Sequence, residues 1–193
     1  DEKEVFIKHF LDSISAVSKG YIKNGMSLID VGTGAGFPGM PLRISLPDLK
    51  VTLLDSLNKR IKFLNQVIFD LSLNNISAVH GRAEDLAQQK EYREHYDFCV
   101  SRAVANLATL SEYCLPFVKK KGYFISYKSE KITEEYEQAK KAIKILGGNY
   151  KNQVEFYLPQ SGIYRNLFII EKIDVTPKKY PRKAGLPSKE PII

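Results

Sequence analysis

The sequence predicts a doubly wound α/β domain, a mostly parallel sheet with helices on both faces. Five short runs of aliphatic and aromatic residues alternate with helical patterns, and strands that alternate with helices join in parallel only through crossovers. Two further strand-like runs near the carboxyl end have a connection too short for a crossover helix. With 193 residues the chain can bury one substantial core, which indicates one main domain.

The individual elements follow from the spacing of apolar residues. Helical spacing predicts an amphipathic helix over residues 4–17. The five alternating strands are predicted at residues 27–31, 51–55, 76–80, 97–101 and 123–128. The helices between and after them are predicted at residues 38–46, 58–73, 83–92, 106–119 and 134–146.

The carboxyl-terminal part changes character after Gly147, Gly148 and Asn149. Strands are predicted at 153–158 and 167–172, and they must pair antiparallel because the residues between them cannot hold a helix. A sheet of seven strands, parallel except for such a hairpin, is the outline of the class I S-adenosylmethionine (SAM)-dependent methyltransferases. We therefore expect an amino-terminal helix over 1–23, a SAM-binding domain over 24–173 and a tail over 174–193. The tail has four prolines among basic residues, which favours an extended or a partly mobile segment.

Composition limits the partners. The net charge of +7 suits a polyanion such as nucleic acid, because bound lysines and arginines displace condensed counterions. Cys99 and Cys114 lie in apolar patterns without metal-ligand spacing, so we expect buried thiols, no metal site and a cytoplasmic location. No apolar run has the length of a membrane span. The chain starts at Asp1 rather than Met, from which we expect a trimmed amino terminus, and we expect a monomer.

A glycine-rich loop, residues 32–39, follows the first strand. Glycines let the backbone turn sharply and approach a ligand at the carboxyl edge of the sheet. Gly34, Gly36 and Gly39 formally match the dinucleotide fingerprint, which sets a pyrophosphate on a helix amino terminus. The register is poor, however, because the first glycine after the strand is Gly32.

Acidic residues around the loop indicate a different ligand. SAM has no pyrophosphate and needs one acid near its amino-acid moiety and another for its ribose hydroxyls. Asp30 and Asp55 occupy those places, although a turn cap and a helix cap are alternative roles for them. Glu84 and Asp85 follow the third strand, where an adenine would lie, but could equally favour a helix start through its dipole.

Several segments resemble the RsmG family, also called GidB, whose members methylate N7 of a guanine in bacterial small-subunit (16S) ribosomal RNA. They are Lys8-His9-Phe10-Leu11-Asp12-Ser13, the loop from Asp30 to Gly39, Leu54-Asp55-Ser56-Leu57-Asn58-Lys59-Arg60, Ser101-Arg102-Ala103 and Pro181-Arg182-Lys183-Ala184-Gly185. The resemblance spans essentially the whole chain in the correct order. Family members usually carry a further helical segment ahead of Lys8.

The resemblance implies SAM as cofactor and a small-subunit ribosomal RNA, or an assembling ribosomal particle, as partner. It implies cofactor contacts from Gly32, Phe37, Ala83, Glu84 and Arg102, with Asp55 as the ribose acid and Asp30, Gly34 and Ser56 as further candidates. Guanine N7 carries a lone pair and no proton, so no general base is expected. Orientation, to which Arg102 and Lys128 could contribute, can supply roughly 7–11 kcal/mol.

An enzyme that acts on guanine N7 also needs donors for the base and partners for phosphates. The candidates for RNA contact are His9, Arg102, Lys128, Tyr164, Arg165 and, in the tail, Lys178, Arg182 and Lys183. We expect Lys119, Lys120 and Lys121 to form a solvated helix terminus. Two other hypotheses remain open, a nucleotide-dependent oxidoreductase that uses Gly34–Gly39 and a noncatalytic RNA-binding module.

Overall fold

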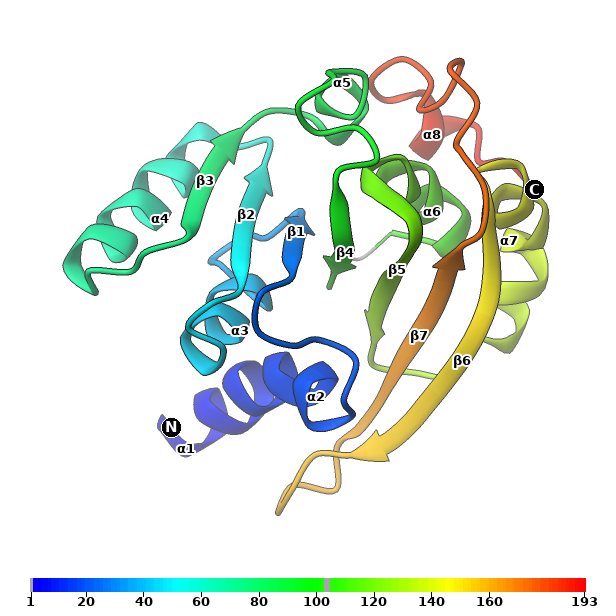
Figure 1. The fold of residues 1–193 in the computed structure, drawn as a ribbon. Helices are drawn as coiled ribbons and strands as arrows, with labels where there is room; N and C mark the ends of the chain where they lie inside the picture. Colours follow the sequence, from blue (N-terminus) through cyan, green and yellow to red (C-terminus); the bar gives the residue numbers. More distant parts are fainter. Residues whose placement is uncertain (1, 103–104) are drawn as a thin grey trace.

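A single seven-stranded sheet organises the computed structural model, which describes residues 2–102 and 105–193 (Figure 1). The order of its strands is β3-β2-β1-β4-β5-β7-β6. The strands are β1 Ser27–Val31, β2 Lys50–Asp55, β3 Ile76–His80, β4 Tyr96–Ser101, β5 Val118–Lys128, β6 Gly148–Tyr157 and β7 Tyr164–Lys172. Asp1 and Ala103, which the sequence analysis used, lie outside the described residues.

Pairing in the sheet is parallel up to β5 and antiparallel beyond it. Ile29 in β1 lies opposite Thr52 in β2 and Cys99 in β4, whereas Lys128 at the end of β5 lies opposite Asn166 at the start of β7. The doubly wound sheet with a terminal antiparallel hairpin is therefore confirmed. All five strands of the alternating pattern are present. β1 and β4 in the middle of the sheet are almost fully buried, so their runs can be continuously apolar, whereas β3 at the edge is partly exposed.

The helices divide between the two faces of the sheet and enclose two apolar cores. The amino-terminal helix comprises α1 Glu2–Val5, a π-helical segment Phe6–Leu11 and α2 Asp12–Ser18. The others are α3 Gly39–Ser45, α4 Asn58–Asp70, α5 Ala83–Leu86, α6 Leu107–Cys114, α7 Thr133–Ile145 and α8 Leu186–Lys189, with a 3₁₀ turn at Leu115–Phe117. Residues of α2, α3 and α4 contribute to one core and those of α5, α6 and α7 to the other. Within the described residues, no helix combines the length and apolar character needed to cross a membrane.

Two predicted helices are shorter than expected. The helix predicted over 106–119 ends at Cys114, because Pro116 lacks an amide donor and the chain tightens into the 3₁₀ turn. The prediction that Lys119, Lys120 and Lys121 cap a helix is wrong: they lie in β5, where Lys119 forms an ion pair with Asp97. The helix predicted over 83–92 comprises only Ala83–Leu86.

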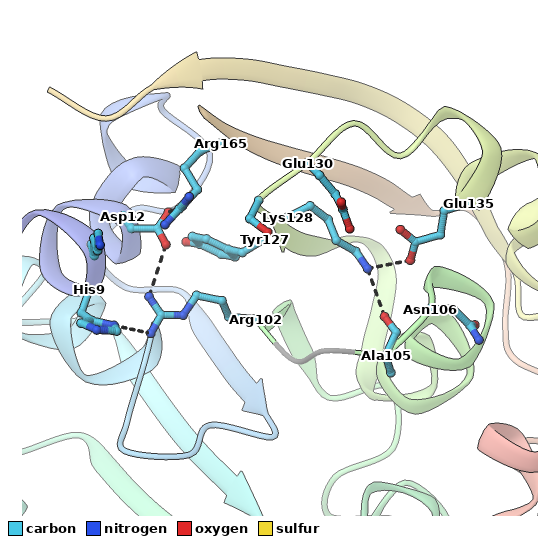
Figure 2. A pocket seen from close by; sticks show the side chains of 12 residues that line it. His9, Asp12, Arg102, Ala105, Asn106, Tyr127, Lys128, Glu130, Glu135 and Arg165 are labelled. Carbon is cyan, nitrogen blue, oxygen red and sulfur yellow. Dashed lines mark hydrogen bonds and ion pairs between the residues drawn. The ribbon is translucent and has the colours of Figure 1, made fainter. Parts of the chain in front are cut away.

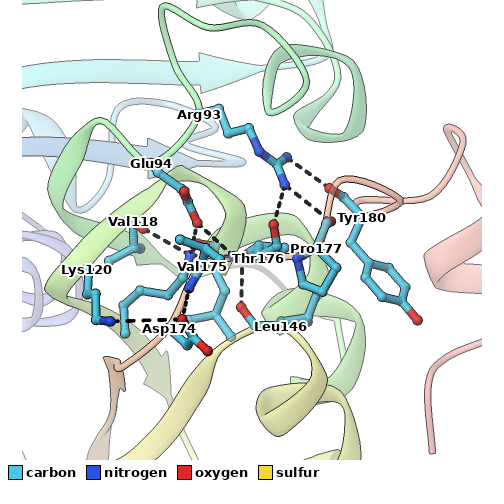
Figure 3. A network of polar contacts seen from close by, with 12 residues as sticks. Arg93, Glu94, Val118, Lys120, Leu146, Asp174, Val175, Thr176, Pro177 and Tyr180 are labelled. Atoms are coloured by element: carbon cyan, nitrogen blue, oxygen red, sulfur yellow. Dashed lines mark hydrogen bonds and ion pairs between the residues drawn. The ribbon is translucent and has the colours of Figure 1, made fainter.

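The carboxyl-terminal tail, residues 174–193, packs against the domain, which differs from the partly mobile segment that its prolines also allow. Lys172 at the end of β7 is fully buried and donates to the carbonyl oxygens of Leu115 and Val118, at 2.8 and 3.1 Å. It also donates to Thr176 Oγ1 at 2.8 Å and lies 3.1 Å from Glu94. This polar network fixes the start of the tail (Figure 3).

Arg93 holds the next part of the tail. Its guanidinium donates to the carbonyl oxygens of Thr176, at 2.8 Å, and Tyr180, at 2.9 Å (Figure 3). Prolines remove backbone donors but leave carbonyl acceptors, and a segment outside the sheet needs partners for them. One arginine satisfies several of these acceptors at once, so the proline-rich chain can pack without forming a strand.

We expect Lys172→Met to lower the free energy of unfolding by about 2–5 kcal/mol, because it leaves two buried carbonyls short of a donor, at about 1–3 kcal/mol each, and removes the cation beside the half-buried Glu94. Urea unfolding measures this change. Lys151→Met, which removes an exposed lysine paired with Glu171, is the matched control and should change stability little. Equal effects of the two substitutions would contradict the role given to Lys172.

Candidate functional site

The candidate site lies where the strand order reverses, between β1 and β4. Ligands of open α/β sheets bind in the crevice at the carboxyl ends of strands at such a switch point. Two cavities open there, a small one of about 200 Å³ and a large one of about 540 Å³. Ala105 lines both cavities, so they are adjacent.

Predicted residues divide between the two cavities. The small cavity is lined by Gly32, Asp55, Ser56, Ala83 and Glu84 among others. The large cavity is lined by His9, Arg102, Lys128 and Arg165 among others (Figure 2). The fold therefore gathers most predicted cofactor residues in one place and the predicted base-contacting residues in the other.

The buried carboxylate of Asp30 holds the glycine loop. Its Oδ2 accepts hydrogen bonds from Thr33 Oγ1 at 2.7 Å and from the Gly39 amide at 2.8 Å, which ties the two ends of the loop together. A side chain at Gly39 would place its Cβ 2.5 Å from Leu53 and 2.9 Å from this carboxylate. Burial raises the pKa of Asp30 to about 6.

The same contacts disfavour a pyrophosphate on this loop. The loop amides already have partners. The amide of Gly34 donates to Asp55 Oδ2 at 2.9 Å, the amide of Gly36 donates to the Thr33 carbonyl at 3.0 Å, and the amide of Gly39 donates to Asp30. A carboxylate thus already lies at the start of α3, where the dinucleotide fingerprint requires a phosphate. This geometry argues against the oxidoreductase hypothesis.

Asp55 is fixed at the end of β2 and lines the small cavity. It is almost fully buried, and besides Gly34 it accepts from the Leu57 amide at 2.9 Å and from Arg60 at 3.1 Å. The two roles considered for Asp55, helix cap and ribose acid, are therefore compatible. Its carboxylate supports the turn before α4 and also lines the cavity. A carboxylate held in this way can accept hydrogen bonds from ligand hydroxyl groups.

Ala83 and Glu84 form the opposite wall of the small cavity. The side chain of Glu84 is buried, and its Oε1 accepts from the amide of Gly185 in the tail at 2.8 Å. Tyr113 of α6 also lines this cavity, and the sequence analysis missed it. An aromatic residue at helical spacing does not reveal from the sequence whether it faces a core or a ligand.

A buried acid, Asp12, connects two arginines in the large cavity. Arg102 lies 3.3 Å from its Oδ2 and Arg165 3.1 Å from its Oδ1 (Figure 2). His9 Nδ1 lies 3.3 Å from the Arg102 guanidinium. Asp12 was part of the Lys8–Ser13 motif but had no predicted role, because its partners come from strands far away in the sequence.

Phe37 supports Arg102 from the other side. The guanidinium lies over the ring of Phe37 at 5.3 Å from its centroid, and the rings of His9 and Phe10 pack on Phe37 at 5.5 and 5.2 Å. This cation–π contact, together with Asp12, gives Arg102 a defined direction. Phe37 therefore lies beside the large cavity rather than among the residues that line the small one.

Lys128 is held at the far side of the large cavity. Its Nζ donates to the carbonyl of Ala105 at 3.0 Å and to Glu135 at 2.6 Å (Figure 2). Its side chain is mostly buried. Tyr164 lies at the start of β7 and does not line the cavity. Its hydroxyl is hydrogen-bonded to Glu155.

The three tail residues predicted to contact RNA differ in their surroundings. Lys178 and Lys183 are exposed. Arg182 instead pairs with Glu112, whose side chain is 1% exposed, with Nη2 2.7 Å from Oε2. Among residues 2–102 and 105–193, no group of three histidine, cysteine, aspartate or glutamate side chains is arranged to hold a metal ion.

Comparison with known proteins identifies close relatives. The profile of one family, described as GidB, rRNA small subunit methyltransferase G, matches residues 1–164. A protein of Alkaliphilus oremlandii named ribosomal RNA small subunit methyltransferase G is 58% identical over 192 residues, which is 100% of this chain and 80% of that protein. A protein of the same name from Lachnoclostridium phytofermentans is 56% identical over 191 residues, 99% of this chain and 79% of its own length.

A solved structure supports the fold class. Precorrin-6y C5,15-methyltransferase from Geobacter metallireducens matches with a TM-score of 0.59 and 12% identity, over 83% of this chain and 87% of that chain. A likeness at this identity concerns the fold alone. Together with the strand order, it confirms the class I methyltransferase fold that the terminal hairpin predicts.

We expect Asp30→Asn to change how stability depends on pH. The folded protein keeps a proton on Asp30 between pH 3.8 and about 6, whereas the unfolded chain loses it, so this group makes stability fall as pH rises through that window. Asparagine does not titrate there. The free energy of unfolding of the wild type relative to Asp30→Asn should therefore fall by about 2.4 kcal/mol between pH 4 and pH 7.

Urea unfolding of both proteins at several pH values measures this difference, and the variant serves as the control for all other titrating groups. A difference between the two proteins that stays constant with pH would contradict the assignment.

Proposed function

Because the chain belongs to the rRNA small subunit methyltransferase G family, we propose that it transfers a methyl group from SAM to N7 of a guanine in small-subunit ribosomal RNA. The observation that carries this proposal is the pair of adjacent cavities at the switch point. One is lined by a fixed carboxylate suited to a ribose, and the other by positively charged groups suited to an RNA base. The methyl donor and the acceptor base would meet beside Ala105.

The residues of the small cavity fit SAM. Asp55 would accept hydrogen bonds from the ribose hydroxyls, and Gly32 offers an exposed backbone without a Cβ. Ala83 and Glu84 would lie against the adenine, with Ser56 and Gly34 next to the ribose. When bound, SAM supplies a methyl group on a positively charged sulfur, ready for direct transfer to a nucleophile.

Asp30 would act on the cofactor indirectly. Its carboxylate is used by Thr33 and Gly39, so it keeps the loop in shape for the methionine part of SAM. Its charge lies at the start of α3, and there it would favour a cation over a phosphate as the group bound next to the loop. A neutral Asp30 would weaken this second effect without removing the first.

The residues of the large cavity would orient the guanine. N7 attacks through its lone pair, so no side chain has to remove a proton. Arg102 and Lys128 can donate to O6 of the base while N7 stays free, and both are held in place by carboxylates. Orientation of this kind can contribute roughly 7–11 kcal/mol to lowering the barrier.

Phosphate contacts would come from groups that line this cavity and from exposed lysines of the tail. We assign them to His9, Arg165, Lys178 and Lys183, of which the two lysines are exposed. Asp12 and Glu135 already balance part of the positive charge in the cavity, so the exposed lysines should provide most of the salt-dependent affinity. A ribosomal RNA substrate, free or in an assembling particle, implies action in the cytoplasm.

Methyl transfer tests the proposal directly. Small-subunit RNA, or the small subunit itself, from cells that lack the enzyme is incubated with the protein and SAM labelled in its methyl group. We expect one methyl group per RNA, at N7 of a guanine, located by chemical cleavage at N7-methylguanine. Labelling at another atom would contradict the proposal, as would no labelling of either substrate.

Calorimetry tests the cofactor assignment. We expect the protein to bind SAM and not NADH, because the start of α3 carries the Asp30 carboxylate. Asp55→Asn should weaken SAM binding about tenfold, since one good charge-assisted hydrogen bond is worth about 1.5–3 kcal/mol. Asp48→Asn, which removes one exposed carboxylate elsewhere, is the control. Binding of NADH, or equal SAM affinity in the two variants, would contradict the assignment.

A further inference from the structure

We propose that the carboxyl-terminal tail forms an outer wall of the cofactor cavity and that Arg182 is a positioning residue for cofactor binding. This inference rests on the proposed function, because it takes the small cavity as the SAM site. It assigns to the basic, proline-rich tail a role other than following the RNA backbone. The contacts of three tail residues, taken in order along the chain, support it.

Arg182 forms the strongest of these contacts. Its backbone amide and its Nε donate to Glu112 Oε1 at 2.8 and 2.9 Å, and its Nη2 lies 2.7 Å from Oε2. Such a two-pronged pair is strong and specific in direction. Glu112 is buried inside α6, and an unpaired buried carboxylate is costly, so the position of the tail at Arg182 is well defined.

The next contacts reach residues of the cavity itself. The amide of Gly185 donates to Glu84, which lines the small cavity, at 2.8 Å. Gly185 has a φ of +84°, a left-handed conformation that a glycine adopts without strain. Two residues on, the carbonyl of Pro187 accepts from Thr109 of α6 at 3.0 Å.

These contacts join the two helices that bound the cavity. Glu84 belongs to α5, and α6 carries Glu112 next to Tyr113, the aromatic residue of the cavity wall. The tail therefore bridges α5 and α6 from outside. Arg93 and Lys172 hold Thr176 at the beginning of the tail, ahead of this bridging segment (Figure 3).

The direction of the Arg182 side chain distinguishes a cavity wall from an RNA-binding arm. An arginine that contacts phosphates must face solvent, whereas the guanidinium of Arg182 is directed to a buried acid. Its neighbour Lys183 is exposed. If docking of the tail raises the affinity for SAM, SAM must stabilise the docked tail by the same factor, because coupling between two binding equilibria is reciprocal.

Hydrogen exchange in the wild-type full chain tests this coupling. We expect SAM to slow exchange of the backbone amides of Arg182 and Gly185 at least severalfold. Amides of the exposed turn at residues 160–162 provide the internal control. Tail amides that exchange at the same rate with and without bound SAM would overturn the inference. A wild type that does not bind SAM at all would instead overturn the proposed function.

Arg182→Met tests the positioning role. We expect the Kd for SAM to rise about tenfold, while the affinity for RNA measured without SAM changes less than twofold. Lys189→Met, which removes an exposed charge from the same tail, should leave the Kd for SAM unchanged. Unchanged SAM affinity in Arg182→Met, with or without weaker RNA binding, would overturn the inference.

Arg182→Met leaves the buried Glu112 carboxylate without its partner, and this could unfold the protein. In that case a double variant provides a folded protein for the same test. Glu112→Met/Arg182→Met removes both charges, and replacing a buried pair with apolar groups of similar size is often neutral for stability. Its tail amides should exchange faster than those of the wild type and its Kd for SAM should rise. Faster tail exchange with wild-type SAM affinity would overturn the inference.

Discussion

A buried carboxylate at the end of the first strand sets the geometry on which the site depends. Asp30 binds both ends of the glycine loop, and this places the start of α3 and the Gly34 amide beside Asp55. The same charge occupies the helix amino terminus that a dinucleotide would need. One interaction thus shapes the loop and selects against a phosphate-bearing ligand, at the expense of burying an acid whose pKa rises to about 6.

In the large cavity, too, buried or half-buried carboxylates fix the positions of neighbouring groups. Three of the cations that line it, Arg102, Arg165 and Lys128, are each held by an acidic partner, Asp12 or Glu135. Such ion pairs lower the net positive charge of the cavity. They also fix the direction of each hydrogen-bond donor before an RNA base binds. For attack by guanine N7, which needs no proton removed, a fixed direction is what this part of the protein can contribute. In the proposed function, affinity for RNA would then depend on the exposed lysines outside this cavity.

The tail shows how a basic, proline-rich composition can mislead. Prolines exclude a strand and lysines suggest a polyanion, and both arguments hold locally. Neither anticipates that Arg93 and Lys172, from two other elements, satisfy the polar groups of the tail, or that α6 carries a buried acid for Arg182. Charges that look available for RNA in the sequence divide into exposed lysines and one half-buried arginine, which is paired with a buried acid. The packed tail becomes part of the domain in this way.

The sequence by itself determined the alternating strands and helices, the terminal hairpin and the glycine loop. Through its resemblance to a family of ribosomal RNA methyltransferases it also predicted several of the residues that line the two cavities, among them Asp55 and Arg102. These features depend on local periodicity and on short motifs, which a linear chain displays directly. Only the tertiary structure decided the roles of Asp12, Glu112 and Tyr113, because each acts through neighbours that lie far away along the chain. It also decided where β5 begins, since Pro116 ends the helix before it and pairing with β4 places Val118 and the lysines after it in the sheet.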